Sequence, residues 1–178
     1  MKKILLIVLC SFSLPVFAQM KSATLTAGGL TCSMCSKAIY KALLKVPFIK
    51  EVQPDVEASK YVVIFKEHTP VVIDDVKKAV ENAGFSVTAM QVTAYFDNVE
   101  IYNDAHLNIG GSTLHFLHVD KQRLQGDKTF TIVDKNFISV ARHKAYAQYT
   151  KMECFETGVM ASCCPKENSS NRIYHVTM

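Results

Sequence analysis

Between residues 20 and 94 the apolar positions switch repeatedly between the period of a strand and the period of a helix. Ala23, Leu25 and Ala27 alternate with threonines, which predicts a strand with one buried face. Apolar residues then recur at helical spacing until Pro47, which is expected to end that helix. Continued in this way, the pattern predicts strand 23–27, helix 38–46, strand 49–56, strand 60–65, helix 73–83 and strand 85–94. This order indicates an antiparallel sheet with both helices on one face, the ferredoxin-like βαββαβ plan.

After Tyr95 the pattern changes to short apolar runs separated by turn residues. Such spacing is typical of a small β-rich domain, for which a partly open barrel is one arrangement. The whole chain is therefore expected to be of the α+β class, with one domain at 20–95 and a second at 96–178. The expected strands of the second domain are Thr113–Val119, Thr129–Val133, Asn136–Val140 and Arg172–Thr177.

The first 18 residues have the pattern of a secretory signal peptide. Lysines at positions 2 and 3 precede an apolar run from Ile4 to about Leu14, and small or branched residues follow up to Ala18. The run is too short to cross a bilayer, and Pro15 interrupts it. We expect cleavage after Ala18, export to the periplasm or the medium, and no stable insertion of the mature protein in a membrane.

Charge and composition exclude several classes of function. Lysine and arginine number 20, and aspartate and glutamate number 16. Without Lys2 and Lys3 the count is 18 against 16, a net charge of about +2, which gives no reason to expect a nucleic-acid partner. The chain shows no phosphate-binding loop, paired carboxylates or nucleophile motif, so we do not expect an enzyme.

The candidate chemistry of the first domain lies in a loop that contains Cys32 and Cys35. Two thiols separated by two residues can close on one ion. Cys35 falls where the helix is expected to begin, and there the positive end of the helix dipole stabilises a thiolate. Thiolates without a histidine or carboxylate beside them favour a soft ion of low coordination number such as Cu(I).

The segment from Gly29 to Cys35, together with Val80–Phe85, resembles the heavy-metal-associated domain family, which includes copper chaperones, modules of copper-transporting ATPases and the periplasmic mercury-binding protein. The resemblance covers a little under half the chain. The family usually has methionine where this chain has Leu30. Its zinc and cadmium members tend to carry an acidic residue where this chain has Thr31. Phe85 matches an aromatic position that covers the metal loop in many relatives, although core packing explains it equally well.

The resemblance implies a Cu(I) chaperone or scavenger that holds the ion between Cys32 and Cys35 and passes it by ligand exchange. Its partner would be a metal-transporting ATPase or another metal-handling protein. Hg(II), or another soft metal, is the alternative cargo, since Hg(II) also accepts two thiolates linearly. A thiol–disulfide oxidoreductase that uses the same two cysteines ranks below both, because such enzymes commonly carry an aromatic residue before the first cysteine, where this chain has Thr31.

Three further cysteines, Cys154, Cys163 and Cys164, lie near the C-terminus together with two methionines and His175. They indicate either a second soft-metal site, which could receive the ion from the first, or a disulfide from Cys154 to one of the other two. The disulfide is favoured because secreted cysteines at such spacing usually pair.

The remaining candidates are histidines and lysines. His115 and His118 are expected on opposite faces of a strand, and therefore not on one ion. The other isolated histidines are expected to be surface residues: His68, His106 and His143. Lysines recur every fourth residue on the first helix, where a solvated face is favoured over a docking surface: Lys37, Lys41 and Lys45.

Overall fold

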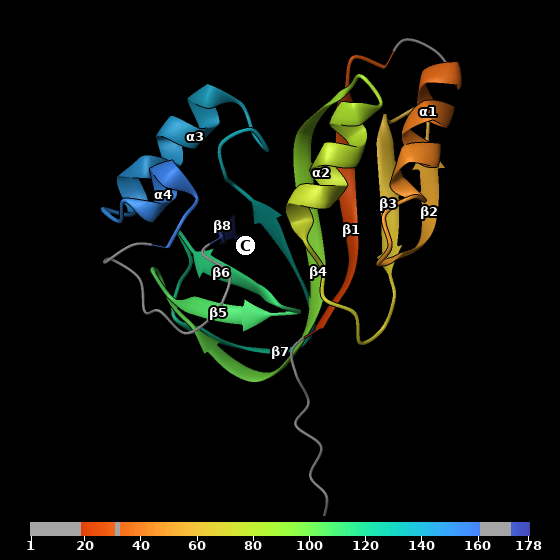
Figure 1. Cartoon of the computed structure of the whole chain (residues 1–178). Helices are drawn as coiled ribbons and strands as arrows, with labels where there is room; N and C mark the ends of the chain where they lie inside the picture. The colour runs from red at the N-terminus through yellow and green to blue at the C-terminus, as the bar shows by residue number, and fades with distance from the viewer. Residues whose placement is uncertain (1–18, 31–32, 161–171) are drawn as a thin grey trace, which may run out of the picture.

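One open sheet of eight strands runs through the part of the chain that the structure describes (Figure 1). The computed structural model describes residues 19–30, 33–160 and 172–178. The strands are ordered β2-β3-β1-β4-β7-β8-β6-β5, and the pair β6–β8 is parallel while the other pairs are antiparallel. The expected signal peptide and three of the candidate residues, Cys32, Cys163 and Cys164, lie outside the described residues.

The elements follow one another along the chain with these bounds. They are β1 (Gln19–Gly28), α1 (Ser33–Leu43), β2 (Ile49–Asp55), β3 (Lys60–Phe65), α2 (Ile73–Asn82), β4 (Ser86–Ile101), β5 (His106–Ile109), β6 (Ser112–Phe116), β7 (Gln122–Ile132), α3 (Val140–Tyr146), the 3-10 helix η1 (Ala147–Tyr149), α4 (Cys154–Thr157) and β8 (Ile173–Thr177).

The first half has the predicted βαββαβ order, and both helices lie on one face of the sheet (Figure 1). Helix α2 presents Ile73, Val76 and Val80 to the core, as its apolar spacing predicts. Helix α1 ends at Leu43, earlier than expected, and Ala38 is exposed rather than buried. The predicted α+β class and the ferredoxin-like unit are confirmed.

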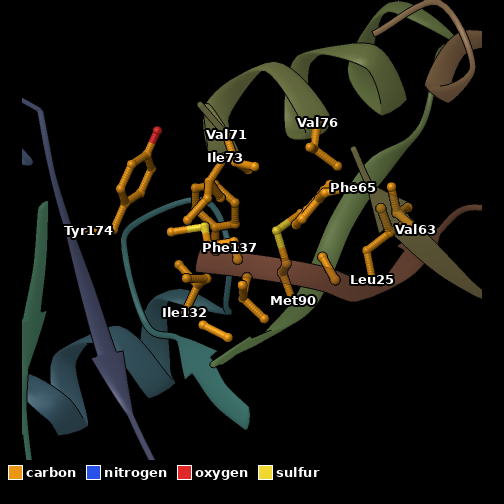
Figure 2. Packing of buried hydrophobic residues seen from close by; sticks show 14 of the residues in the cluster. Leu25, Val63, Phe65, Val71, Ile73, Val76, Met90, Ile132, Phe137 and Tyr174 are labelled. Atoms are coloured by element: carbon orange, nitrogen blue, oxygen red, sulfur yellow. The ribbon is translucent and has the colours of Figure 1, made fainter. Parts of the chain in front are cut away.

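Strand β4 is longer than predicted and joins the two halves. It pairs with β1 from Ser86 to Tyr95 and with β7 from Gln91 to Ile101, so the sheet continues across the expected boundary at residue 95. The buried cluster likewise runs from Leu25 and Val63 to Phe137 and Tyr174 (Figure 2). The two halves share a sheet and a core, and their division into two folding units stays a prediction.

The second half is β-rich but contains helices that the apolar pattern did not predict. Strands β6, β7 and β8 overlap the expected runs. The prediction of a strand at Asn136–Val140 is wrong. Asn136 has φ 71°, a left-handed conformation that interrupts an extended chain, and the Ser139 side chain accepts a hydrogen bond from the backbone of Arg142 at the start of α3. The helices α3, η1 and α4 have seven, three and four residues, too few to show a helical period.

An ionic network connects the C-terminal strand to α2. Arg172 donates to Asp74 in the first turn of α2 at 2.8 Å and to Asp134 at 2.8 Å. The Asp74 backbone donates to the Tyr174 hydroxyl at 3.1 Å. Burial acts against the charge of Arg172, but its hydrogen bond with Asp74 and the charges of Asp134 and Asp74 outweigh it and raise the pKa of the guanidinium. Arg172 therefore stays charged and links the two halves.

The described part of the chain contains no helix that is both long and apolar enough to span a bilayer.

Candidate functional site

The loop between β1 and α1 places its second cysteine in the first turn of a helix. Gly29 has φ 84°, a conformation that glycine adopts without strain, and it turns the chain out of β1. Cys35 is the third residue of α1 and is half-buried, whereas Met34 is 77% exposed. The side chain between the two cysteine positions thus points into solvent, and the described part of the loop is open on that side.

The residues beneath this loop are packed rather than polar. Leu30 and Phe85 are partly buried against the core cluster. A Cβ placed on Gly29 would lie 3.9 Å from the Phe85 ring, so the ring is directly beside the loop. Phe85 therefore has the expected packing role and lies beside the described part of the loop at Gly29, while its covering of the metal loop stays a prediction.

A buried hydrogen bond supports the start of α1. The Tyr61 hydroxyl donates to the Ser36 hydroxyl at 2.9 Å, and both side chains are almost fully buried. Ser36 directly follows Cys35, so this bond ties the helical turn that holds the cysteine to β3. Sequence reasoning missed this pair because a serine in an amphipathic helix gives no signal of its partner.

The charge around the loop favours a thiolate. The first turn of α1 contains no acidic residue, so no carboxylate there competes for the positive end of the helix dipole. Lys37 and Lys41 are exposed along α1, and Lys45 is exposed just beyond its end. A thiolate at Cys35 is therefore placed at a helix start without a neighbouring negative charge from that turn.

A second group of metal-ligating side chains lies in the other half of the protein. His106 on β5 and His115 on β6 are directly opposite each other in the strand register, and Cys154 at the start of α4 approaches them. The ligand atoms of these three residues all lie within 4.8 Å of one another. His115 and Cys154 are fully buried.

Two sequence predictions about histidines are therefore wrong. His106 was expected at the surface, but its ring stacks on that of His115 with 4.4 Å between centroids. His143 is buried and stacks on Phe155 at 4.3 Å. Neither contact has a local signal, because β5–β6 pairing and the packing of α3 bring the rings together. His115 and His118 do not share a site, as expected, although for a different reason: β6 ends at Phe116, and His118 is exposed beyond it and stacks on Tyr149.

Burial keeps the imidazoles of this group neutral. The pKa of His115 falls to about 4, mainly through burial and also through His175 and His106, although Asp104 acts in the opposite direction. Burial likewise lowers the pKa of His106. Neutral imidazoles carry the lone pairs that metal binding requires.

Comparison with known proteins identifies the first half. The family model of the heavy-metal-associated domain matches residues 24–86. The mercuric transport protein periplasmic component of Pseudomonas fluorescens is 34% identical over 86 residues, which are 48% of this chain and 93% of that protein. The Shigella flexneri protein of the same name is 32% identical over 43% of this chain and 84% of its own length. The chain therefore belongs to the heavy-metal-associated domain family.

Solved structures are similar to the same part of the chain. Oxidised MerP from Ralstonia metallidurans CH34 is 31% identical over 38% of this chain and 96% of its own, with a TM-score of 0.35. A structure of the CopZ metallochaperone is 22% identical over 38% of this chain and 98% of its own, with a TM-score of 0.35. The family match ends at residue 86, so the group of His106, His115 and Cys154 lies beyond it.

Proposed function

We propose that this protein is an exported carrier of a thiophilic metal ion, which it holds between Cys32 and Cys35. The observation that carries the proposal is the position of Cys35 in the first turn of α1, beside an exposed Met34 and above a packed support. A loop that is packed against the core on one side and exposed to solvent on the other suits a site from which the ion must be transferred. Membership of the heavy-metal-associated domain family supports the same conclusion.

Cu(I) is the cargo that the described chemistry favours. Two thiolates satisfy an ion of low coordination number, whereas Zn(II) prefers four ligands. The first turn of α1 offers no carboxylate as a further hard ligand. Hg(II) is the second candidate, and the mercuric transport proteins among the relatives favour it.

Transfer by ligand exchange needs no change of oxidation state. A thiolate of the partner approaches on the open side and becomes a third ligand of the ion. One of the two cysteines of this chain then leaves and takes up the proton that the partner's thiol gave up, and a second thiol of the partner replaces the other cysteine in the same way. Lys37 is exposed on α1 two residues after Cys35, where it would attract an acidic partner surface.

The pattern of residues 1–18 supports export of this activity to the periplasm or the medium. A metal-transporting ATPase or another metal-handling protein is the proposed partner, and nucleic acid is not. The role is binding and transfer rather than catalysis. Thiol–disulfide exchange by the same cysteines is the alternative, because an oxidising compartment can convert the pair to a disulfide.

Substitution of both cysteines tests the proposal. The chain from residue 19 onward, reduced and without oxygen, is titrated with Cu(I) and separately with Hg(II) against a chromophoric chelator. The Cys32→Ser, Cys35→Ser variant should bind one equivalent fewer of the preferred ion than the unchanged chain. Met34→Leu is the matched control and should retain that equivalent. Equal stoichiometry in the double variant and the unchanged chain would overturn the proposal.

A further inference from the structure

A row of three histidines crosses neighbouring strands of the second half. His106 on β5 pairs in register with His115 on β6, and His115 pairs in register with His175 on β8. The rings of His115 and His175 are 5.0 Å apart between centroids. Side chains at paired positions point to the same face of a sheet, so this face carries an imidazole on each of three strands. Cys154 lies against two neighbouring members of the row, His106 and His115.

The hydrogen bonds of His115 direct one nitrogen toward the sulfur. Its Nε2 donates to the Asp104 carboxylate at 2.9 Å, which leaves the lone pair on Nδ1. That Nδ1 lies 3.9 Å from the Cys154 sulfur. A carboxylate that fixes the tautomer of a histidine from behind is the usual arrangement around metal ligands. Asp104 is accordingly a positioning residue.

His106 also presents a nitrogen that the described residues leave unused. The Asp104 backbone forms a hydrogen bond with this side chain. Its Nε2 is buried, and no hydrogen-bond partner for it exists among the described residues. A buried imidazole nitrogen without a partner costs stability, and binding of an ion would remove that cost.

We propose that His106, His115 and Cys154 form a second metal site, which binds Cu(I) with three ligands. Metal–nitrogen and metal–sulfur bonds of roughly 2.0 and 2.3 Å at a trigonal angle place the sulfur about 3.8 Å from each nitrogen. The separation between the Cys154 sulfur and His115 Nδ1 is 3.9 Å. All other separations are within 4.8 Å, so closure around an ion needs movements on the order of 1 Å.

The surroundings favour a monovalent ion over a divalent one. Cu(I) with one thiolate and two neutral imidazoles has no net charge, which lowers the cost of burial. Cys154 packs with Met152, Met160 and Ile173, a cluster that adds no carboxylate to the site. Zn(II) would require a fourth ligand and would leave a net positive charge on the group. The proposed site differs from the Cys32–Cys35 site in having nitrogen ligands and in being buried.

A chain without the first site isolates this one. The Cys32→Ser, Cys35→Ser variant is reduced, loaded with Cu(I) and examined by X-ray absorption at the copper edge. We expect one tightly bound Cu(I) per chain with two nitrogens and one sulfur around it. Adding His106→Gln should remove one nitrogen and weaken binding at least tenfold. His118→Asn is the matched control, because His118 is exposed and has φ 54°, which asparagine tolerates.

Each other result would overturn the proposal. These contradicting results are the absence of tightly bound copper, coordination by sulfur alone, unchanged Cu(I) affinity after His106→Gln, and preferential binding of Zn(II). The absorption spectrum requires no substitution within the site, so misfolding of a variant cannot obscure the result. Because the experiment is done without Cys32 and Cys35, a negative result leaves the proposed function of the loop untouched. A failure of the loop to bind metal would likewise leave this test of the second site unaffected.

Discussion

At the scale of single residues, the same chemical group has opposite surroundings in the two halves. Cys35 is half-buried at a helix start, where a thiolate is stabilised and remains accessible. Cys154 is fully buried beside an imidazole nitrogen. The first environment suits exchange of an ion with a partner, and the second suits retention. The sequence spacing singled out Cys35 as a candidate ligand, whereas nothing near Cys154 in the sequence pointed to His106.

The buried His115 predicts how stability depends on pH in the metal-free protein. Its pKa is about 4 in the folded chain and returns to 6.5 on unfolding. Between these values the unfolded chain binds a proton that the folded chain excludes, so the free energy of unfolding falls as pH falls through this window. The contribution is fully present above pH 6.5. The expected loss between pH 7 and pH 5 is about 2 kcal/mol.

Urea unfolding of the metal-free chain at the two pH values measures this loss. His68→Asn should show the same dependence, because His68 is exposed. Equal free energies of unfolding at pH 7 and pH 5 would contradict a neutral, buried His115.

At the scale of elements, periodicity predicted the parts of the fold that are long enough to show a period. The order from β1 to α2 follows from alternation and helical spacing, and β8 follows from its β-branched and aromatic residues. The helices α3 and α4 were missed because they are held by local capping and tertiary packing. The row of histidines was missed because it depends on register between strands, which single-strand patterns do not determine.

The connection between α2 and β8 gives a prediction at the same scale. Arg172→Met removes the ion pairs with Asp74 and Asp134 and leaves the Asp134 carboxylate, which is 5% exposed, without its cation. Loss of hydrogen bonds between charged groups at a partly buried site should lower the free energy of unfolding by about 2 kcal/mol. Denaturant unfolding measures the change. Arg142→Met, at an exposed position, is the control, and an equal effect of the two substitutions would contradict the role of Arg172.

At the scale of the whole molecule, the two groups of donors lie on different parts of one sheet. In the strand order, β4, β7 and β8 separate β1, which leads into the cysteine loop, from β6, which carries His115. Four steps between neighbouring strands correspond to about 19 Å along the sheet. Figure 1 shows β5 and β6 on the opposite side of the molecule from α1. We do not expect direct ligand exchange between the two groups at that separation, so we expect the proposed second site to act independently rather than as a relay.

The central claim is that Cys32 and Cys35 hold the transferred ion, and native mass spectrometry combined with cysteine alkylation tests it most directly. The chain is exported to the periplasm of a bacterial host, purified without oxygen, loaded with Cu(I) and alkylated before and after removal of the metal. Protection of both Cys32 and Cys35 by the bound ion, lost on its removal, is the predicted result. Alkylation of both cysteines while the metal remains bound would contradict the claim.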